Sequence, residues 1–282
     1  MKQHPAFRVF LYAAALVVAF VTLAPFAWLV VSSLVTLRDL ITVPMHLEQM
    51  HFSFDRYLSV FTNPHDELAS SFLWSMANSL VVAFVVTLVG LVTGALGSYA
   101  FARLRFFGKR PLLYLLLFTY MIPPVVIVVP LYVVINALGL LDTKVTLVML
   151  YLSMAVPFVV WVMQSYFGSI GKSFEEAALM DGCSRLQTLW HVYLPMAKPG
   201  MIATGILAFL LSWDEFFFSL IFTSTLNAKT IPVAIAEFTG KNSVDFGMIA
   251  TGGVLASLPP LLITIFFQKQ IVTGMTGGGN KE

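Results

Sequence analysis

The sequence has few of the charged residues that a soluble protein uses to cover its surface, since only 11% of its 282 residues are charged. Hydrophobic residues make up 59% of the chain, and the mean hydropathy is +0.88. Such a chain cannot shield its apolar residues from water, so the composition indicates a membrane protein with lipid as its solvent. The net charge of +2 is too small to indicate a nucleic-acid-binding protein.

Several kinds of functional site are also missing from the sequence. The single cysteine, Cys183, excludes an intramolecular disulfide and gives no cysteine-based metal cluster. His46, His51 and His65 are scattered without metal-ligand spacing and are interpreted as solvated loop residues. The sequence contains no glycine-rich phosphate loop of the Walker type. We therefore expect no catalytic residue, no metal and no cofactor bound by this chain.

Long apolar runs are what the sequence has in place of these features. Six of them are long enough to cross a hydrocarbon core of about 30 Å. They occupy residues 9–35, 73–101, 112–136, 145–167, 201–222 and 248–268. Each should be a helix, because backbone polar groups in lipid must be satisfied within the segment. The sequence therefore predicts an all-α membrane protein, with residues 1–282 as a single domain of six transmembrane helices.

The basic residues indicate which way the chain crosses the membrane. With the N-terminus in the cytoplasm, 11 of the 16 Lys and Arg residues lie on the cytoplasmic side, which agrees with the positive-inside rule. The others are Arg38, Arg56, Lys144, Lys229 and Lys241. Six spans return the C-terminus to the cytoplasm, so both termini are expected there.

Two features inside the expected spans are candidates for a translocation path or a gate. Pro123 and Pro124 remove backbone hydrogen bonds and predict a kink, which either borders a gated path or improves packing. Trp213, Asp214 and Glu215 place two carboxylates in an apolar run, which is costly unless they have partners or face water. The structural alternative is that one carboxylate caps a helix, or bonds to a neighbouring one, at a break in the span.

The polar segment 168–200 interrupts the apolar runs and contains two predicted helix starts. Ser173 with Glu176, and Ser184 with Gln187, each have the spacing of a capping box. In the orientation above, the segment lies in the cytoplasm between the fourth and fifth spans. We therefore predict a cytoplasmic helix–turn–helix.

Two further residues define where these short helices should end. Gly182, directly after Asp181, can take the left-handed conformation that ends a helix. Pro195 is expected to stop the second helix, because the residue before a proline avoids the helical region. The turn between the two helices therefore lies at Asp181 and Gly182.

The order Glu176-Ala177-Ala178, three residues, Gly182, nine residues, then Val192-Tyr193-Leu194-Pro195 resembles the EAA loop of ABC importer permeases. That family usually has isoleucine where Val192 stands. The resemblance implies that the loop docks on a separate ATPase subunit and couples ATP hydrolysis to transport. The implied coupling residues are Glu175, Glu176, Ala177, Ala178, Asp181, Gly182, Leu194 and Pro195.

The similarity extends from Asn78 to Lys281 and is greatest to six-span carbohydrate-uptake permeases, the smaller permease of maltose-type importers. Trp213-Asp-Glu-Phe216 suits that group, although the family often has asparagine at position 214. The resemblance implies a heterodimer with a second permease, two ATPase subunits that bind ATP and Mg, and an extracytoplasmic solute-binding protein facing residues 223–247. It also implies a sugar-like substrate and a bacterial or archaeal cytoplasmic (inner) membrane.

Other functions remain open at this point. Glycerol phosphates and polyols are alternative substrates within the same family. From a different class, the chain could be a proton-coupled secondary transporter with Asp214 or Glu215 as the proton carrier. The absence of inverted repeats in the sequence and the presence of the Glu176 loop disfavour this alternative.

Overall fold

The computed structural model describes residues 5–42, 50–62, 67–239 and 244–277. His46 and His65, and the basic residues Lys2, Lys241 and Lys281 used for the orientation, lie outside these ranges. The described residues form helices joined by turns and loops, with no β-strand among them. This confirms the predicted all-α fold class.

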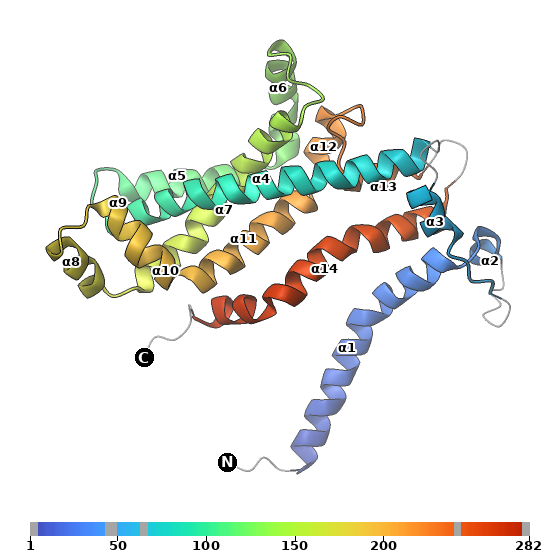
Figure 1. The fold of residues 1–282 in the computed structure, drawn as a ribbon, viewed down its shortest axis with the longest axis horizontal. Helices are drawn as coiled ribbons and strands as arrows, with labels where there is room; N and C mark the ends of the chain where they lie inside the picture. Colours follow the sequence, from blue (N-terminus) through green and yellow to red (C-terminus); the bar gives the residue numbers. More distant parts are fainter. Residues whose placement is uncertain (1–4, 43–49, 63–66, 240–243, 278–282) are drawn as a thin grey trace. The chain divides into compact units, whose positions relative to one another are not determined.

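Four helices are long and apolar enough to cross a membrane, and each overlaps one of the predicted runs (Figure 1). They are α1 (Pro5–Leu34), α4 (Glu67–Arg103), α7 (Lys144–Ser169) and α14 (Phe246–Gly277). Two bent pairs of helices raise the number of candidate spans to six if each pair is one span.

The predicted single helix over residues 112–136 is instead two helices. α5 (Lys109–Met121) and α6 (Pro124–Ala137) are bent by 90° relative to each other. Pro123 is extended, with φ −61° and ψ 130°, and forms the N-cap of α6. Pro124 lies in the first turn of α6, where its missing N–H leaves no helical hydrogen bond unmade. The two prolines therefore break the span instead of only kinking it.

The predicted span over residues 201–222 is also divided. α11 (Lys198–Trp213) ends where Asp214 begins a short break, and α12 (Phe217–Phe222) follows. The second bent pair of candidate span length joins α11 to the preceding segment Arg185–Met196, at an angle of 84°.

Two compact units can be distinguished by their internal contacts. One contains the described residues up to Leu73 together with Ala234–Leu258, and the other contains Trp74–Val233 and the described residues from Pro259 onward. In the second unit, glycines permit close helix packing, because small residues let membrane helices approach. A Cβ on Gly94 of α4 would lie 2.3 Å from the side chain of Val159 in α7.

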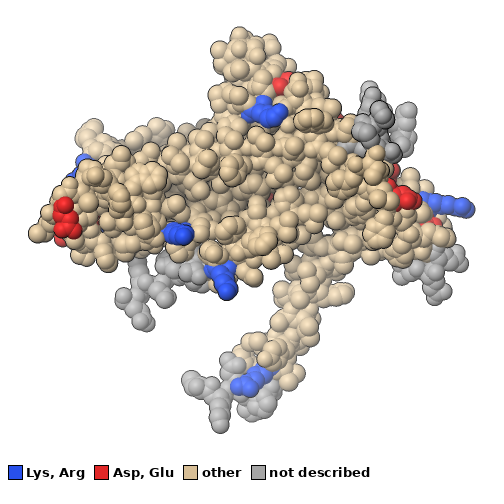
Figure 2. Space-filling model, in the orientation of Figure 1, with Lys and Arg blue, Asp and Glu red and all other residues tan. Residues whose placement is uncertain are grey.

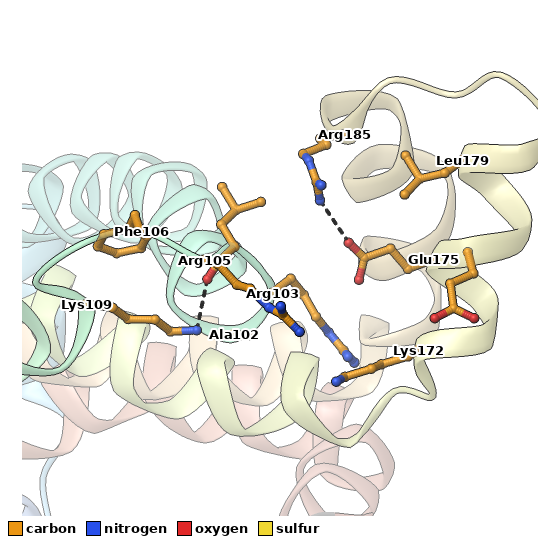
Figure 3. A pocket seen from close by; sticks show the side chains of 11 residues that line it. Ala102, Arg103, Arg105, Phe106, Lys109, Lys172, Glu175, Leu179 and Arg185 are labelled. Atoms are coloured by element: carbon orange, nitrogen blue, oxygen red, sulfur yellow. Dashed lines mark hydrogen bonds and ion pairs between the residues drawn. The ribbon is translucent and has the colours of Figure 1, made fainter.

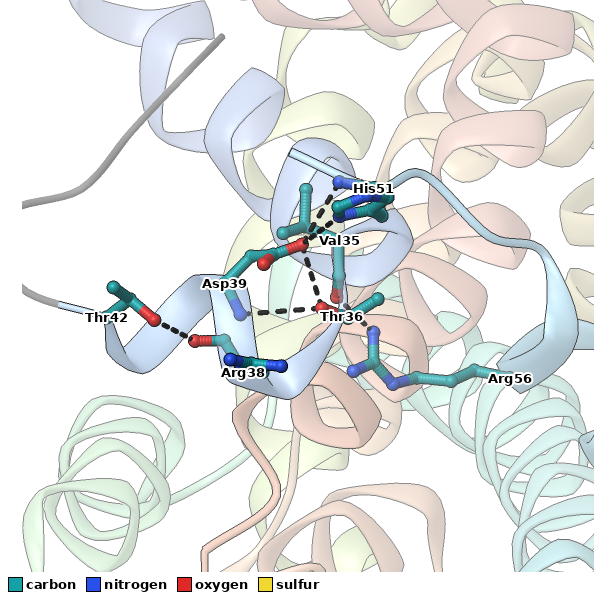
Figure 4. A network of polar contacts seen from close by, with 7 residues as sticks. All are labelled: Val35, Thr36, Arg38, Asp39, Thr42, His51 and Arg56. Carbon is teal, nitrogen blue, oxygen red and sulfur yellow. Dashed lines mark hydrogen bonds and ion pairs between the residues drawn. The ribbon is translucent and has the colours of Figure 1, made fainter. Parts of the chain in front are cut away.

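The first unit contains α1, α2 (Leu37–Ile41), α3 (Asp55–Thr62) and a polar network that holds the segment after α1 (Figure 4). The Arg56 guanidinium donates to the Val35 carbonyl at 2.6 Å and to the Ser33 carbonyl at 3.3 Å. These carbonyls at the end of α1 have few helical partners left, so Arg56 supplies the missing donors.

The surface of the chain is consistent with lipid or subunit contact. The apolar window of α1 has no buried residue, and Phe10 and Phe20 are 70% and 74% exposed. Figure 2 shows that most of the displayed face carries neither basic nor acidic side chains. A large exposed apolar surface of this kind requires lipid or a partner to cover it.

Candidate functional site

The polar segment begins with α8 (Lys172–Met180), and its start differs from the prediction. Gly171 is the N-cap, with φ −58° and ψ 141°, and no side chain caps this helix. Ser173 is therefore already inside the first turn, where its hydroxyl cannot act as an N-cap. The predicted capping box of Ser173 and Glu176 is wrong, because the helix starts two residues earlier, with Gly171 as its N-cap.

The second predicted capping box is present at α9 (Arg185–Thr188). The Ser184 hydroxyl accepts from the Gln187 amide N–H, and the Gln187 side chain accepts from the Ser184 amide N–H at 2.8 Å. Between the two helices, Gly182 has a φ of +86°, as expected for the left-handed residue that ends α8. A residue with a side chain would be strained in this conformation.

The helix after Ser184 does not stop at Pro195, contrary to the prediction. It continues through the π-helical turn η2 (Leu189–Tyr193) into α10 (Leu194–Met196). The wider π turn interrupts the α-helical hydrogen-bond pattern directly before the proline, and Pro195 then lies in the first turn of α10. The chain leaves the helix at Ala197 instead.

Glu175 connects α8 to the helices that follow it. One of its carboxylate oxygens lies 3.2 Å from the Arg185 guanidinium, and the other accepts a hydrogen bond from the Tyr193 hydroxyl at 2.9 Å. The Glu175 side chain is only 13% exposed, whereas that of Arg185 is 58% exposed. Glu175 therefore has two partners within the chain, and both help to fix the position of α8.

Tyr193 attaches this loop to the ends of the long helices. Its fully buried ring packs edge-on against Tyr99 of α4 and Phe167 of α7, with centroid distances of 5.2 and 5.7 Å. The Arg103 guanidinium lies 5.0 Å from the centre of the same ring and donates to the carbonyls of Phe167 and Ile170. The position of α8 is therefore linked through Tyr193 to α4 and α7.

Glu176 differs from Glu175 in its surroundings. It is exposed, and its carboxylate has no hydrogen bond or ion pair to any residue in the described part of the chain. Met180, one helical turn later, is 88% exposed, while Ala178 between them is buried. α8 thus presents one carboxylate to its own chain and the other to the surroundings.

A pocket of about 740 Å³ lies between α8 and the turn that joins α4 to α5 (Figure 3). Most of its polar lining is basic, with two carboxylates among the cations. It is lined by Ala102, Arg103, Leu104, Arg105, Phe106, Lys109, Lys172, Glu175, Glu176, Leu179 and Arg185. The pocket therefore includes both glutamates of the predicted coupling segment.

Two of the residues proposed for a translocation path or gate, Trp213 and Glu215, have structural partners. The Trp213 ring is buried and stacks on Phe209 at 5.6 Å. The Glu215 carboxylate accepts from the amide N–H groups of Phe218 and Ser219 at 2.9 and 3.3 Å, and so caps the start of α12. The capping role considered for one carboxylate at a break in the span is thus what the geometry shows for Glu215.

Asp214 is exposed and lines an apolar recess of about 450 Å³ together with Glu215. The other lining residues are Phe158, Leu207, Leu210 and Leu211. Pro123 and Pro124 are not part of this recess. The structure therefore groups the two carboxylates but does not bring the proline pair to them.

Sequence reasoning missed the structural role of Asp142. Its carboxylate accepts from the Ser224 and Thr225 amide N–H groups at 2.9 and 3.0 Å and from the Thr225 hydroxyl. Asp142 has a φ of +57°, which is rare for a residue other than glycine. Burial raises its pKa, but the bonds from the Thr225 hydroxyl and the two amides outweigh this effect, so the pKa lies below its ordinary value. The only indication of this role in the sequence was the position of the aspartate, directly after Gly139-Leu-Leu.

Comparison with known proteins finds membrane components of transport systems, both by a family model and among individual relatives. A sequence model of a family described as "binding-protein-dependent transport system inner membrane component" matches residues 87–277. The chain is 31% identical over 282 residues to the trehalose/maltose transport system permease protein MalG of Thermococcus litoralis, covering 100% of this chain and 99% of that protein. It is 36% identical over 231 residues to the trehalose transport system permease protein SugB of Mycobacterium tuberculosis, covering 81% and 82%.

The fold is also similar to that of a solved structure. A chain from a bacterial ABC transporter involved in the import of the acidic polysaccharide alginate matches with a TM-score of 0.72. The match covers 95% of this chain and 99% of that chain, at 24% sequence identity. At this identity the similarity shows a shared fold.

Proposed function

The chain belongs to the family of binding-protein-dependent transport system inner membrane components, and on this premise we propose that it imports a sugar together with a solute-binding protein and a separate ATPase. It is an ABC importer permease, a transport subunit with several membrane-spanning helices. The coupling proposal rests on the different surroundings of the two glutamates on α8. Glu175 is bound within the chain, while Glu176 is exposed and available to a partner.

A sugar-like substrate is supported by the relatives, two of which are permeases of trehalose/maltose and trehalose transport systems. Glycerol phosphates and polyols are the alternative substrates. The translocation path would lie between this chain and a second permease, to which this chain contributes about half. The exposed Asp214 beside its apolar recess is the residue of this chain that we place along the path.

We also propose six spans with both termini in the cytoplasm. In this arrangement, α5 with α6 forms a broken third span, α11 with α12 forms the fifth, and α8 and α9 form the cytoplasmic coupling loop. The proposal rests on the 11 of 16 basic residues that it places inside. Reporter fusions after Gly139 and Lys229 should report an external location, and fusions after Lys109 and Arg185 a cytoplasmic one. An external location for Arg185 would refute the coupling role of α8.

In the proposed mechanism, two ATPase subunits bind ATP and Mg, and one of them contacts α8. Closure of the ATPase pair would displace α8, and the Glu175–Tyr193 hydrogen bond would pass this displacement to the ends of α4 and α7. The side of the membrane from which the translocation path is open would then change. This change is only as large as the difference in affinity of each nucleotide state of the ATPase for the two conformations of the permease. The chemistry of hydrolysis belongs to the ATPase.

The test is reconstitution of the chain in liposomes with its partner permease, the ATPase and the binding protein. Uptake of labelled maltose or trehalose should require both internal ATP and the binding protein. Polyols and glycerol phosphates serve as the comparison substrates. Uptake by this chain alone, driven by a pH gradient, would instead establish a proton-coupled secondary transporter.

A further inference from the structure

The pocket beside α8 contains more positive charge than its own carboxylates neutralise. Five basic and two acidic side chains line it, and Glu175 already pairs with Arg185. Arg105 and Lys172 have no hydrogen bond or ion pair to another described residue, and Lys109 donates only to the Leu104 carbonyl, at 3.1 Å. An anion would therefore find three available cations in a single pocket.

The Arg103 side chain also lines the pocket. Its terminal nitrogen donates to the carbonyls of Phe167 and Ile170, but its buried Nε has no hydrogen-bond partner. Of the two carboxylates that line the pocket, that of Glu176 is exposed and has no partner among the described residues.

The pocket lies where an apolar helix of membrane-spanning length ends. α4 stops at Arg103, α5 starts at Lys109, and the turn between them carries two exposed aromatic rings. Phe106 is 39% exposed, and Phe107 is fully exposed. Aromatic and basic side chains occur together where a span meets the headgroup region of a bilayer. This position distinguishes the pocket from a basic patch in open water.

We propose that this pocket binds the phosphate headgroup of an anionic phospholipid. Arg105 would hold the phosphate oxygens with its planar guanidinium, and Lys109 and Lys172 would add point charges. Phe107 would lie in the boundary between headgroups and acyl chains. Lys172 opens α8, whose helical N-terminus also favours a negative charge. The headgroup would therefore bridge the α4–α5 turn and α8, and so stabilise the position of the coupling helix.

The proposal goes beyond the proposed transport function. Its assignment to the cytoplasmic leaflet rests on the proposed topology, and its effect on coupling rests on the proposed role of α8. The experiment uses the assembled transporter, purified with phosphatidylglycerol and phosphatidylcholine. Bound lipid is measured by native mass spectrometry of the wild type and of the triple variant R105Q/K109Q/K172Q. The matched control is R8Q/K198Q/K269Q, which removes three exposed basic residues outside the pocket.

Each basic residue near an anionic surface strengthens binding by about fivefold, so the pocket variant should retain phosphatidylglycerol about 100-fold less tightly. The control variant should retain it like the wild type, and phosphatidylcholine should not bind in either. Equal retention by both triple variants would overturn the proposal. So would loss of the ATPase subunit with lipid retention unchanged, because the pocket would then be a protein docking site.

Two measurements on the unmodified protein test the proposal independently of whether the variants fold. A photoactivatable phosphatidylglycerol should label residues 105–109 and the start of α8, and labelling confined to other helices would contradict the proposal. Inorganic phosphate at millimolar concentration should not displace the lipid. If phosphate alone occupies the pocket and displaces it, the site is one for free phosphate and the lipid proposal fails.

Discussion

The Tyr193 hydroxyl donates a hydrogen bond of 2.9 Å to the Glu175 carboxylate, 18 residues earlier in the chain. This bond joins α8 to a ring that is fully buried against Tyr99 and Phe167. α8 is therefore held by a specific contact in addition to its connecting loops. The Tyr193 side chain therefore connects α8 to the ends of α4 and α7.

The substitution Y193F removes this bond and leaves the ring packing intact. A hydrogen bond to a charged group contributes about 1.5–3 kcal/mol to stability, so the free energy of unfolding should fall by about this amount. Equilibrium unfolding of the purified chain in mixed micelles measures the change. The control is E176Q, an exposed site where the effect should stay within about 0.5 kcal/mol. Equal effects of the two variants would show that the Glu175–Tyr193 bond does not hold α8.

Gly182 tests the turn between α8 and α9. A Cβ at this position would meet no atom within 4 Å, so a substitution is penalised by its backbone conformation alone. With a φ of +86°, valine should cost about 1–2 kcal/mol or more, while asparagine tolerates the left-handed region. We therefore expect G182V to abolish sugar-stimulated ATP hydrolysis and uptake in the reconstituted complex, and G182N to retain most of both. Equal activity of the two variants would mean that the turn does not set the position of α8.

The helices that the sequence predicted correctly are those with a strong local signal. Apolar runs of membrane length gave α1, α4, α7 and α14, because length and hydropathy alone decide them. The capping box at Ser184 and the left-handed Gly182 are also local features, since each depends on only a few neighbouring residues.

The errors occurred where a local rule competed with a neighbouring residue or a distant contact. The N-cap of α8 is Gly171 and not Ser173. Pro195 lies within a helix that continues through the π turn before it. The sequence left the capping role of Glu215 undecided, because no residue pattern marked a helix break after Trp213. The partners of Asp142, 82 and 83 residues away in the chain, could not be found from local spacing at all.

Asp142 predicts a dependence of local stability on pH. Its pKa is lower in the folded chain than its ordinary value, so its contribution is fully present above the unfolded pKa of about 4. The contribution is lost as the pH falls from that value through the folded pKa. Hydrogen exchange should therefore show the Ser224 and Thr225 amides protected at neutral pH and progressively less protected below about pH 4.

The variant D142N isolates this effect. It removes the charge but keeps one acceptor oxygen, so exchange of the same two amides at neutral pH should accelerate by about 10- to 100-fold. The pH dependence should disappear with the carboxylate. A wild-type pH profile that persists in D142N would assign the titration to another group.

The last prediction concerns Glu176 and its proposed pairing with a basic group on the ATPase. The structure excludes one of its two candidate roles, because no capping box forms with Ser173 and the N-cap is Gly171. The exposed position of the carboxylate on α8 fits the other role. Removing one partner of a buried charge pair costs roughly 2–5 kcal/mol, which corresponds to a loss of affinity of about 30-fold or more.

We therefore expect E176K to leave the chain inserted and folded, but to abolish co-purification with the ATPase and coupled uptake. E176Q, which lacks the charge but adds no repulsion, should be intermediate. D55K is the matched control, because Asp55 is also an exposed carboxylate near a helix start, on a side of the membrane that the ATPase should not reach. If E176K transports sugar as well as D55K does, then α8 is a plain connector and the ATPase must engage this chain elsewhere.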